Sequence, residues 1–177
     1  LMTVLMSDAV AMLTPQARTA YESGDLADIT FADDTLLVGV SPAFLNEFLA
    51  AVSAAGQRYG MELHFGKLQL LSIQCATDIR MPNGQALAAS PDMTYLGTTL
   101  HEDGRLGPEL GRRFGCAKGE FQKLCKVWAH STLTTAKKLH ICQSLVETKL
   151  LYGLSCHCFN AAEMRRPTGF QARCIRQ

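Results

Sequence analysis

Two adjacent carboxylates, Asp33 and Asp34, lie between two segments whose residues are typical of β-strands. Residues 26–32 and 35–40 are rich in Ile, Thr, Phe, Leu and Val, so the sequence predicts a hairpin with the two aspartates at its tip. Burying two neighbouring negative charges without a partner is costly, and a divalent cation removes that cost. Carboxylate oxygens are the ligands that Mg²⁺ prefers. The dipeptide is also common in ordinary polar turns, so its surroundings must decide between the two interpretations.

The elements around this hairpin predict a small sheet with one packed helix. Residues 2–21 have helical spacing that Pro15 interrupts, and residues 41–60 form the clearest helix, with Ser41 as a cap and Pro42 in its first turn. Further strands are expected at residues 68–74 and 92–100. Between them, the Pro-Asn-Gly sequence at residues 82–84 predicts the turn of a second hairpin.

After residue 104 the pattern becomes entirely helical. Helices are expected over residues 108–128, from a cap at Ser131 or Thr132 to about residue 152, and over residues 161–176. The predicted fold class is therefore α+β, in which a small antiparallel sheet with a packed helix (residues 1–106) is followed by an all-α bundle (residues 107–177).

The charge of the chain differs between these two parts. Residues 1–104 hold 4 Lys and Arg against 12 Asp and Glu, whereas residues 105–177 hold 13 against 4, and the net charge is +1. The acidic part is suited to cations and the basic part to phosphates. Two solvated surfaces of opposite sign that dock on each other would give the same pattern.

Composition excludes several classes of protein. The chain has 177 residues, 47% of them hydrophobic, which is enough for a globular core. No run of apolar residues is long enough to span a membrane, and no secretory signal is present at the first residues, so an intracellular protein is expected, in a compartment that the sequence does not specify. The seven cysteines are then expected to be reduced thiols. Cys156, His157, Cys158 and Cys174 are a weak zinc pattern, and packed helix cysteines are the favoured interpretation.

Four segments, in order, resemble the reverse transcriptases of non-LTR (LINE-type) retrotransposons. "FADDTLL" (31–37) resembles the catalytic hairpin, "YGMELHFGKLQLL" (59–71) the segment after it, and "MTYLGTTLHEDGRL" (93–106) the primer-grip hairpin. "LTTAKKLHICQSLVETKLLYGLSCHCF" (133–159) resembles the thumb helices. The resemblance covers about residues 25–177 and implies the second half of a polymerase palm followed by a thumb.

The resemblance implies an RNA-directed DNA polymerase in which a primer 3′-hydroxyl attacks a dNTP with the help of two Mg²⁺ or Mn²⁺ ions. Asp33 corresponds to the metal ligand of the hairpin, and Asp34 to its more weakly bound neighbour. Phe31 and Ala32 correspond to positions beside the primer terminus. Lys67 corresponds to a group near the leaving pyrophosphate, although a solvated loop lysine is an equal alternative. Tyr95, Leu96 and Gly97 correspond to the primer grip.

The basic helices imply the partners of such a polymerase. The resemblance places an RNA template and a DNA primer against the backbone-contacting residues Arg112, Arg113, Lys118, Lys123, Lys126, Lys137 and Lys138, which contact phosphates without reading sequence. A merely solvated face is the alternative. Phe114, Phe121 and Trp128 follow at seven-residue steps, which is more typical of a helix core than of a base-stacking platform. No membrane partner is expected.

The chain departs from the family pattern at two places. Residues 1–27 contain neither the strand that carries the first metal-binding Asp nor the loop that holds the incoming nucleotide, and Asp8 lies in a helix-like run. Around Lys67, the residues His64, Phe65, Gly66 and Leu68 differ from the family's usual types. We therefore expect a piece of a longer chain, which lacks the first half of the palm and the fingers and does not polymerise DNA by itself. The alternative is a non-catalytic, nucleic-acid-binding remnant of a retroelement.

Overall fold

Proline divides the predicted N-terminal helix into two. In the computed structural model, which describes residues 1–75, 78–154 and 159–176, helix α1 spans Met2–Ala11 and helix α2 spans Pro15–Ser23. Pro15 removes a backbone donor and fits the first turn of α2, where the side chain of Thr14 accepts a hydrogen bond from the Ala17 amide at 3.3 Å. The sequence predicted one interrupted helix over residues 2–21. The observed break falls at the expected proline, and α2 continues to Gly24, which ends it in the left-handed conformation.

The predicted hairpin is present, and its register differs by one residue from the prediction. Strand β1 (Leu26–Phe31) pairs antiparallel with β2 (Asp34–Gly39), and Phe31 lies opposite Asp34. The two-residue turn is therefore Ala32–Asp33, and not Asp33–Asp34 as expected. Asp34 belongs to the first pair of the strands, so only Asp33 lies at the tip.

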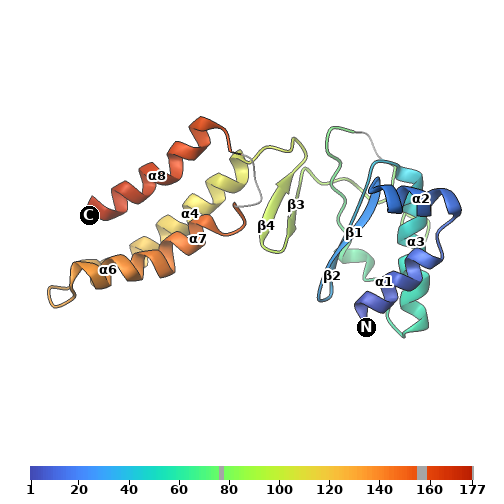
Figure 1. Cartoon of the computed structure of the whole chain (residues 1–177), viewed down its shortest axis with the longest axis horizontal. Helices are drawn as coiled ribbons and strands as arrows, with labels where there is room; N and C mark the ends of the chain where they lie inside the picture. Colours follow the sequence, from blue (N-terminus) through green and yellow to red (C-terminus); the bar gives the residue numbers. More distant parts are fainter. Residues whose placement is uncertain (76–77, 155–158, 177) are drawn as a thin grey trace. The chain divides into compact units, whose positions relative to one another are not determined.

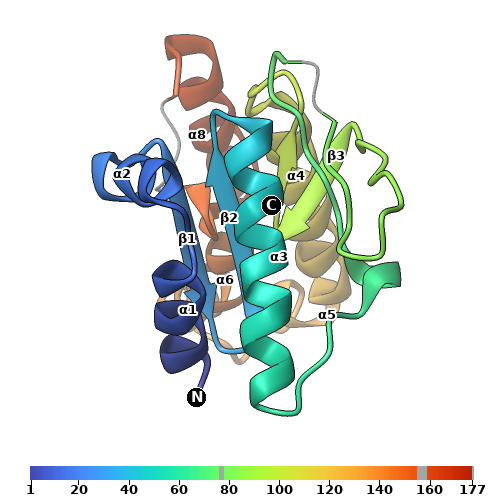
Figure 2. The same cartoon turned by 90° about the vertical axis from the view of Figure 1, so that its right-hand side faces the viewer.

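Helices cover one face of this hairpin. Helix α3 (Pro42–Arg58) packs on β2, α2 packs on β1, and α1 packs against α3, as Figures 1 and 2 show from two directions. Leu26 and Phe48 are fully buried in the core between them. The remaining buried members of this core come from α1, α2, α3 and the connection between α1 and α2: Leu5, Met6, Ala9, Leu13, Ala17, Ala20, Ala51, Val52 and Ala55. Apolar residues at helical spacing in α3 thus pack as the sequence predicted.

The segment after α3 contains less strand than expected. The 3₁₀-helix η1 spans Phe65–Lys67, and residues 68–74 form only one isolated bridge, between Leu70 and Ala89. The hairpin around residues 82–84 is present as backbone hydrogen bonds, among them Met81 N to Gln85 O at 2.8 Å. The strand predicted from the apolar residues of 68–74 is therefore wrong, because this segment is an irregular connection.

The segment predicted from its residue types as one strand over residues 92–100 is two strands, in agreement with the resemblance of residues 93–106 to a hairpin. Strand β3 (Asp92–Tyr95) and strand β4 (Thr98–His101) form a second two-stranded sheet. Between them Leu96 and Gly97 have positive φ angles of 48° and 73°. Two consecutive residues with positive φ are typical of a tight hairpin turn, which reverses the chain at this point.

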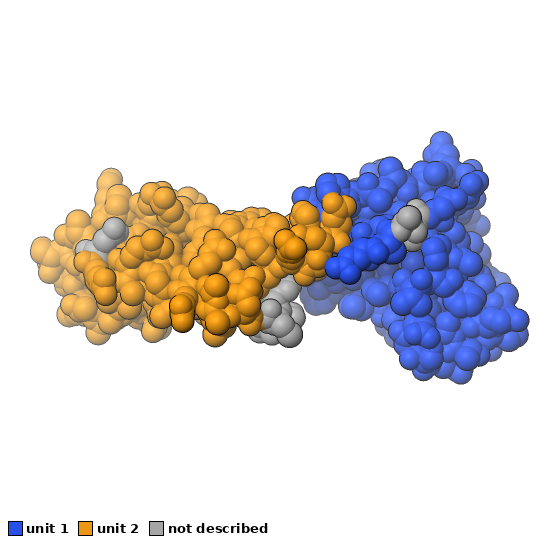
Figure 3. Space-filling view, turned by 90° about the horizontal axis from the view of Figure 1, so that it is seen from above, with its two compact units in different colours: residues 1–96 blue, residues 97–177 orange. Residues whose placement is uncertain are grey.

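The chain divides into two compact units within this turn, Leu1–Leu96 and Gly97–Gln177 (Figure 3). Strand β4 therefore belongs to the helical unit, whereas the sequence predicted a boundary between residues 106 and 107. The mixture of small antiparallel sheets and helices confirms the predicted α+β class.

The second unit is helical as expected. Helix α4 spans Gly107–Lys123, the short α5 spans Cys125–Trp128, and α8 spans Ala161–Arg176. Between α5 and α8 lie α6 (Thr135–Cys142), the π-helix η2 (Gln143–Glu147) and α7 (Thr148–Leu151). Thr134 caps α6, and not Ser131 or Thr132 as predicted.

The aromatic residues of this unit pack in its interior. Phe114, Phe121 and Trp128 lie against a buried cluster around Ala117 and Val146. The rings of Phe121 and Trp128 are stacked with centroids 5.0 Å apart. This confirms the prediction of a helix core rather than a base-stacking platform. Helix α4 also carries a row of glycines at every fourth position, Gly107, Gly111, Gly115 and Gly119.

Five cysteines lie among the described residues, and all are free thiols. The weak zinc pattern is only partly described, because Cys156, His157 and Cys158 lie outside the described residues. In residues 1–75, 78–154 and 159–176, no helix combines the length and the apolar character needed to cross a bilayer.

Gly153 offers a test of packing in the helical unit. Its φ is +71°, and a Cβ added there would lie 2.5 Å from the Thr98 Oγ1. We expect Gly153→Ala to lower the free energy of unfolding by about 2–4 kcal/mol, through left-handed strain and overpacking together. Chemical denaturation of the chain measures this loss.

Gly24 provides the matched control, because its φ is +87° and a Cβ there would meet nothing within 4 Å. Gly24→Ala is expected to cost only about 1 kcal/mol, from strain alone. In a Thr98→Ala background, the loss of unfolding free energy caused by Gly153→Ala should fall towards about 1 kcal/mol, because the crowding atom is removed. An unchanged cost in that background would show that the side chain of Thr98 does not crowd this position.

Candidate metal-binding hairpin and buried carboxylate

The β1–β2 hairpin presents Asp33 and Asp34 to solvent. Both residues are exposed, and Phe31 beside them is 63% exposed. Ala32 has a φ of 54°, which costs an alanine about 1–2 kcal/mol relative to ordinary backbone conformations. The turn therefore holds a non-glycine residue in a strained conformation directly before the first aspartate.

The two faces of the hairpin differ in character. Leu26 and Leu37 lie on the face covered by helices. The other face carries Ile29, Phe31 and Val38, which are 51%, 63% and 47% exposed. Because side chains alternate along a strand, Asp34 lies on this open apolar face, opposite Phe31. The Asp34 carboxylate thus lies on the same face as the exposed apolar side chains of the hairpin.

Tyr95 connects strand β3 to this hairpin. Its hydroxyl donates a hydrogen bond to the Ile29 carbonyl at 2.8 Å. Burial of the phenol, together with the nearby Asp34 carboxylate, raises the pKa of Tyr95. Tyr95 thus ties β3 to the β1–β2 hairpin within the first unit.

The other carboxylates near the hairpin have partners within the first unit. Asp28 accepts hydrogen bonds from Tyr21 at 2.7 Å and from Thr30 at 3.1 Å, and the bond to Asp28 raises the pKa of Tyr21 to about 12. Asp25 accepts from Ser23, and Asp8, which lies in α1 as expected, accepts from Tyr59. These residues stabilise the unit rather than face the tip.

The donor set at the tip fits a partial magnesium site. Within the described part of the chain, no group of three or more His, Cys, Asp or Glu side chains is placed to hold a metal ion. Mg²⁺ in nucleotide-dependent enzymes is commonly bound by one or two carboxylates, several waters and substrate phosphates. Asp33 and Asp34 could supply the carboxylates of such a site.

Lys67 lies at the end of η1 and is exposed. Among the described residues, no hydrogen bond or ion pair joins its ammonium group to the hairpin. Its expected position near a leaving pyrophosphate therefore stays a prediction.

A buried carboxylate organises the turn at Leu96 and Gly97 from the side of the helical unit. Glu109 is 2% exposed and accepts hydrogen bonds from Arg112 Nε at 2.7 Å, Arg113 Nε at 2.6 Å and the Thr99 amide at 3.1 Å. Arg112 Nη2 and Arg113 Nη2 both donate to the Gly97 carbonyl, at 2.7 Å and 2.5 Å. The Arg113 guanidinium also lies 4.7 Å from the centre of the Tyr152 ring.

Four of the seven expected phosphate-contacting residues have partners within the helical unit. Arg112 and Arg113 both bind Glu109 and the Gly97 carbonyl, and Arg113 is only 7% exposed. Lys123 pairs with Glu120 at 3.6 Å, and Lys138 donates to the Trp128 carbonyl at 2.7 Å. Lys118, Lys126 and Lys137 are exposed. Contact of these residues with phosphates stays a prediction.

Sequence reasoning did not identify Glu109. The available signal was an acidic residue with arginines three and four positions later, which is the spacing of side chains that meet on a helix. That pattern is common on solvated helices, and only the burial of Glu109 distinguishes this case.

Comparison with known proteins adds one similarity. The chain is 24% identical over 147 residues, 80% of its length, to an uncharacterized transposon-derived protein of Caenorhabditis elegans. The chain spans about half, 52%, of that relative. No family model matches the chain, and no solved structure matches it significantly. The similarity indicates a transposon-related origin.

The buried position of Glu109 predicts a dependence of stability on pH. Burial opposes ionisation of this carboxyl, but hydrogen bonds from Arg112, Arg113 and the Thr99 amide outweigh it and lower its pKa from 4.5 to about 2. Because the folded-state pKa is depressed, the stabilisation is complete above about pH 4.5 and is lost as the pH falls towards 2. We expect Glu109→Gln to lower the free energy of unfolding by about 3 kcal/mol at pH 7.

Urea denaturation between pH 7 and pH 2.5 measures the difference between the two proteins, which should shrink on the acid side. Glu120→Gln is the control, because Glu120 also pairs with basic side chains, Lys123 and Lys149, but is far less enclosed. Its effect should be much smaller. A Glu109→Gln difference that does not change with pH would contradict the assigned ionisation.

Proposed function

We propose that the chain is the part of a retroelement reverse transcriptase that carries the second half of the palm and the thumb. The observation that carries this proposal is the tight hairpin with Asp33 at its tip, Asp34 beside it and both side chains exposed. A hairpin tip can bring two carboxylates to one space, which the transfer of a nucleotide onto a primer 3′-hydroxyl requires. Similarity to a transposon-derived protein supports the same origin.

Each residue at the tip has a distinct task in this proposal. Asp33 binds a divalent cation, and Asp34 adds a second carboxylate close to the primer end. The chemistry that Mg²⁺ supplies there is neutralisation of phosphate charge during nucleotidyl transfer. Phe31, on the open face, provides an apolar surface for the primer terminus, and Ala32 leaves room for the nucleic acid to approach the backbone.

The turn at Leu96 and Gly97 positions the primer in this proposal. Its backbone conformation is fixed by the two guanidinium groups that bind the Gly97 carbonyl. Tyr95, which precedes the turn, is tied to β1 through the Ile29 carbonyl. The exposed Lys118, Lys126 and Lys137 attract the phosphates of the template–primer duplex. In this proposal the Lys67 ammonium group lies near the leaving pyrophosphate and stabilises its negative charge.

Metal binding separates this proposal from that of a nucleic-acid-binding remnant without catalysis. We expect Asp33→Asn to weaken Mn²⁺ binding about tenfold or more, because it removes a charged oxygen ligand and retains the shape of the side chain. Electron paramagnetic resonance titration of Mn²⁺, with and without a template–primer duplex and a dNTP, measures this affinity. Binding of the duplex itself, followed by fluorescence anisotropy, should not weaken.

Asp92→Asn is the matched control, because Asp92 is also an exposed aspartate at the start of a strand of the first unit. Its Mn²⁺ affinity should equal that of the unaltered chain. Equal affinities for Asp33→Asn and the control would favour the remnant. In a primer-extension assay with Mg²⁺ or Mn²⁺ we expect no incorporation, since only two of the carboxylates of a two-metal site are present.

A further inference from the structure

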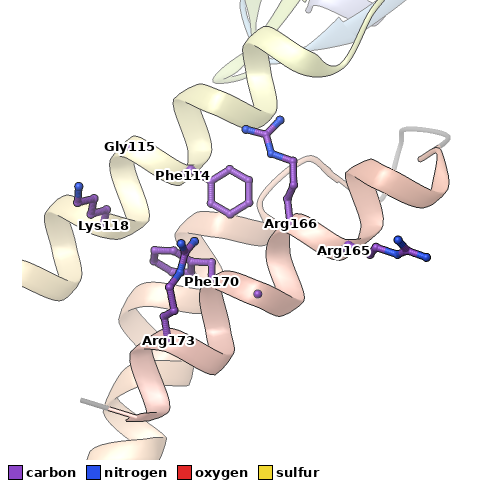
Figure 4. Close-up of a pocket in the computed structure, with 8 residues that line it drawn as sticks. Phe114, Gly115, Lys118, Arg165, Arg166, Phe170 and Arg173 are labelled. Carbon is purple, nitrogen blue, oxygen red and sulfur yellow. The ribbon is translucent and has the colours of Figure 1, made fainter.

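A basic groove lies between helices α4 and α8 in the helical unit. The groove has a volume of about 430 Å³ and is formed by residues that are far apart in the sequence. Four cationic side chains line it, Lys118 from α4 and Arg165, Arg166 and Arg173 from α8, together with the rings of Phe114 and Phe170 (Figure 4). Of these four cations, only Lys118 was expected from the sequence to contact phosphates.

Among the residues that the structure describes, no acidic side chain lines this groove. All four cations are exposed, and within the described part of the chain none of them forms an ion pair. This contrasts with Arg112 and Arg113, which both form ion pairs with Glu109. Four like charges around one groove repel one another, and an anion bound there removes that repulsion.

The floor of the groove is apolar. The rings of Phe114 and Phe170 meet edge to face with centroids 5.7 Å apart, and the Arg166 guanidinium lies 5.1 Å from the centre of the Phe114 ring. Figure 4 shows Arg166 reaching from α8 towards Phe114, and Arg173 beside Phe170. Stacking on the ring orients the planar guanidinium, whose paired donors match a phosphate group.

Two glycines widen the groove. Gly115 on α4 and Gly169 on α8 both line it, and a Cβ added at either position would meet nothing within 4 Å. Packing between the helices therefore does not require a glycine at these positions. A glycine inside a helix costs about 1 kcal/mol relative to alanine. The open space instead allows a ligand to approach the helix backbones.

We propose that this groove binds the phosphate backbone of a single-stranded nucleic acid segment. Arg166 and Arg173 are seven residues apart on α8, about 10 Å along the helix axis, so they suit successive phosphates of a polymer better than one small anion. A groove of this volume accommodates a short unpaired segment rather than a duplex. This inference extends the proposed function, in which Lys118 also contacts phosphates, and it does not depend on a metal at Asp33.

The test replaces Arg166 and Arg173 by glutamine in the full chain. Fluorescence anisotropy with a labelled short oligo(dT), and with oligo(rU) of the same length, measures the affinity at several salt concentrations. Loss of two phosphate contacts should reduce the slope of log K against log salt by about 1.4. The affinity at 0.1 M salt should fall about 10- to 30-fold. Circular dichroism checks that the variant is folded.

Two control variants remove the same charge elsewhere. Arg58→Gln with Arg80→Gln alters the first unit, and Arg105→Gln with Lys149→Gln alters two cations of the helical unit that lie outside the groove and have no proposed contact with nucleic acid. Both should bind the oligonucleotide nearly as tightly as the unaltered chain. If the second control loses as much affinity as the groove variant, binding is diffuse and the proposal is overturned.

Competition experiments with the bound oligonucleotide show which class of ligand the groove prefers. A duplex of the same length should compete less well than the single strand, and poly-glutamate of equal charge should compete poorly. Effective competition by poly-glutamate would mean that the groove accepts an acidic peptide, which would overturn the assignment to phosphates. Asp33→Asn should leave oligonucleotide binding unchanged, so failure of the metal proposal and failure of this one are distinguishable.

Discussion

The register of the β1–β2 hairpin is the constraint on which the first unit depends. Side chains alternate between the faces of a strand, so a slip of one residue would exchange the covered and the open face. The observed register buries Leu26 and places Asp28 within reach of Tyr21. It also leaves Phe31 and Asp34 on the open side. The two-residue turn sets this register, and it does so with Ala32 in a left-handed conformation. The register of the hairpin thus determines both the packing of the core and the exposure of the two carboxylates.

In the helical unit, the basic side chains have two different roles. Arg112 and Arg113 hold the fold together, since both form ion pairs with Glu109 and bind the Gly97 carbonyl. The cations of the α4–α8 groove have no such partner among the described residues and face solvent. The ion pair with the buried Glu109 therefore distinguishes Arg112 and Arg113, which stabilise the fold, from the groove arginines, which are available to a ligand. Counting basic residues in the sequence merges these two groups.

Regular patterns in the sequence predicted the regular elements well. Apolar spacing located α3 and α8, and strand-forming residues located the hairpin at Asp33. The predictions failed where local backbone geometry or long-range contacts decide the outcome. The strand expected at residues 92–100 is broken by positive φ at Leu96 and Gly97, which no propensity marks at a leucine. The turn at Ala32 shifted by one residue for a similar reason. Burial of Arg113 depends on contacts with Gly97 and Tyr152, which sequence spacing alone does not place beside it.

The row of glycines along α4 affects how the helical unit folds. Three of them, Gly111, Gly115 and Gly119, lie within the helix, and together they disfavour it by about 3 kcal/mol relative to alanine. An isolated segment with this composition does not persist as a helix in water. Helix α4 therefore forms only together with the elements it contacts, chiefly α7, η2 and β4. Its amide hydrogens are then expected to exchange with solvent chiefly when α4 separates from these elements.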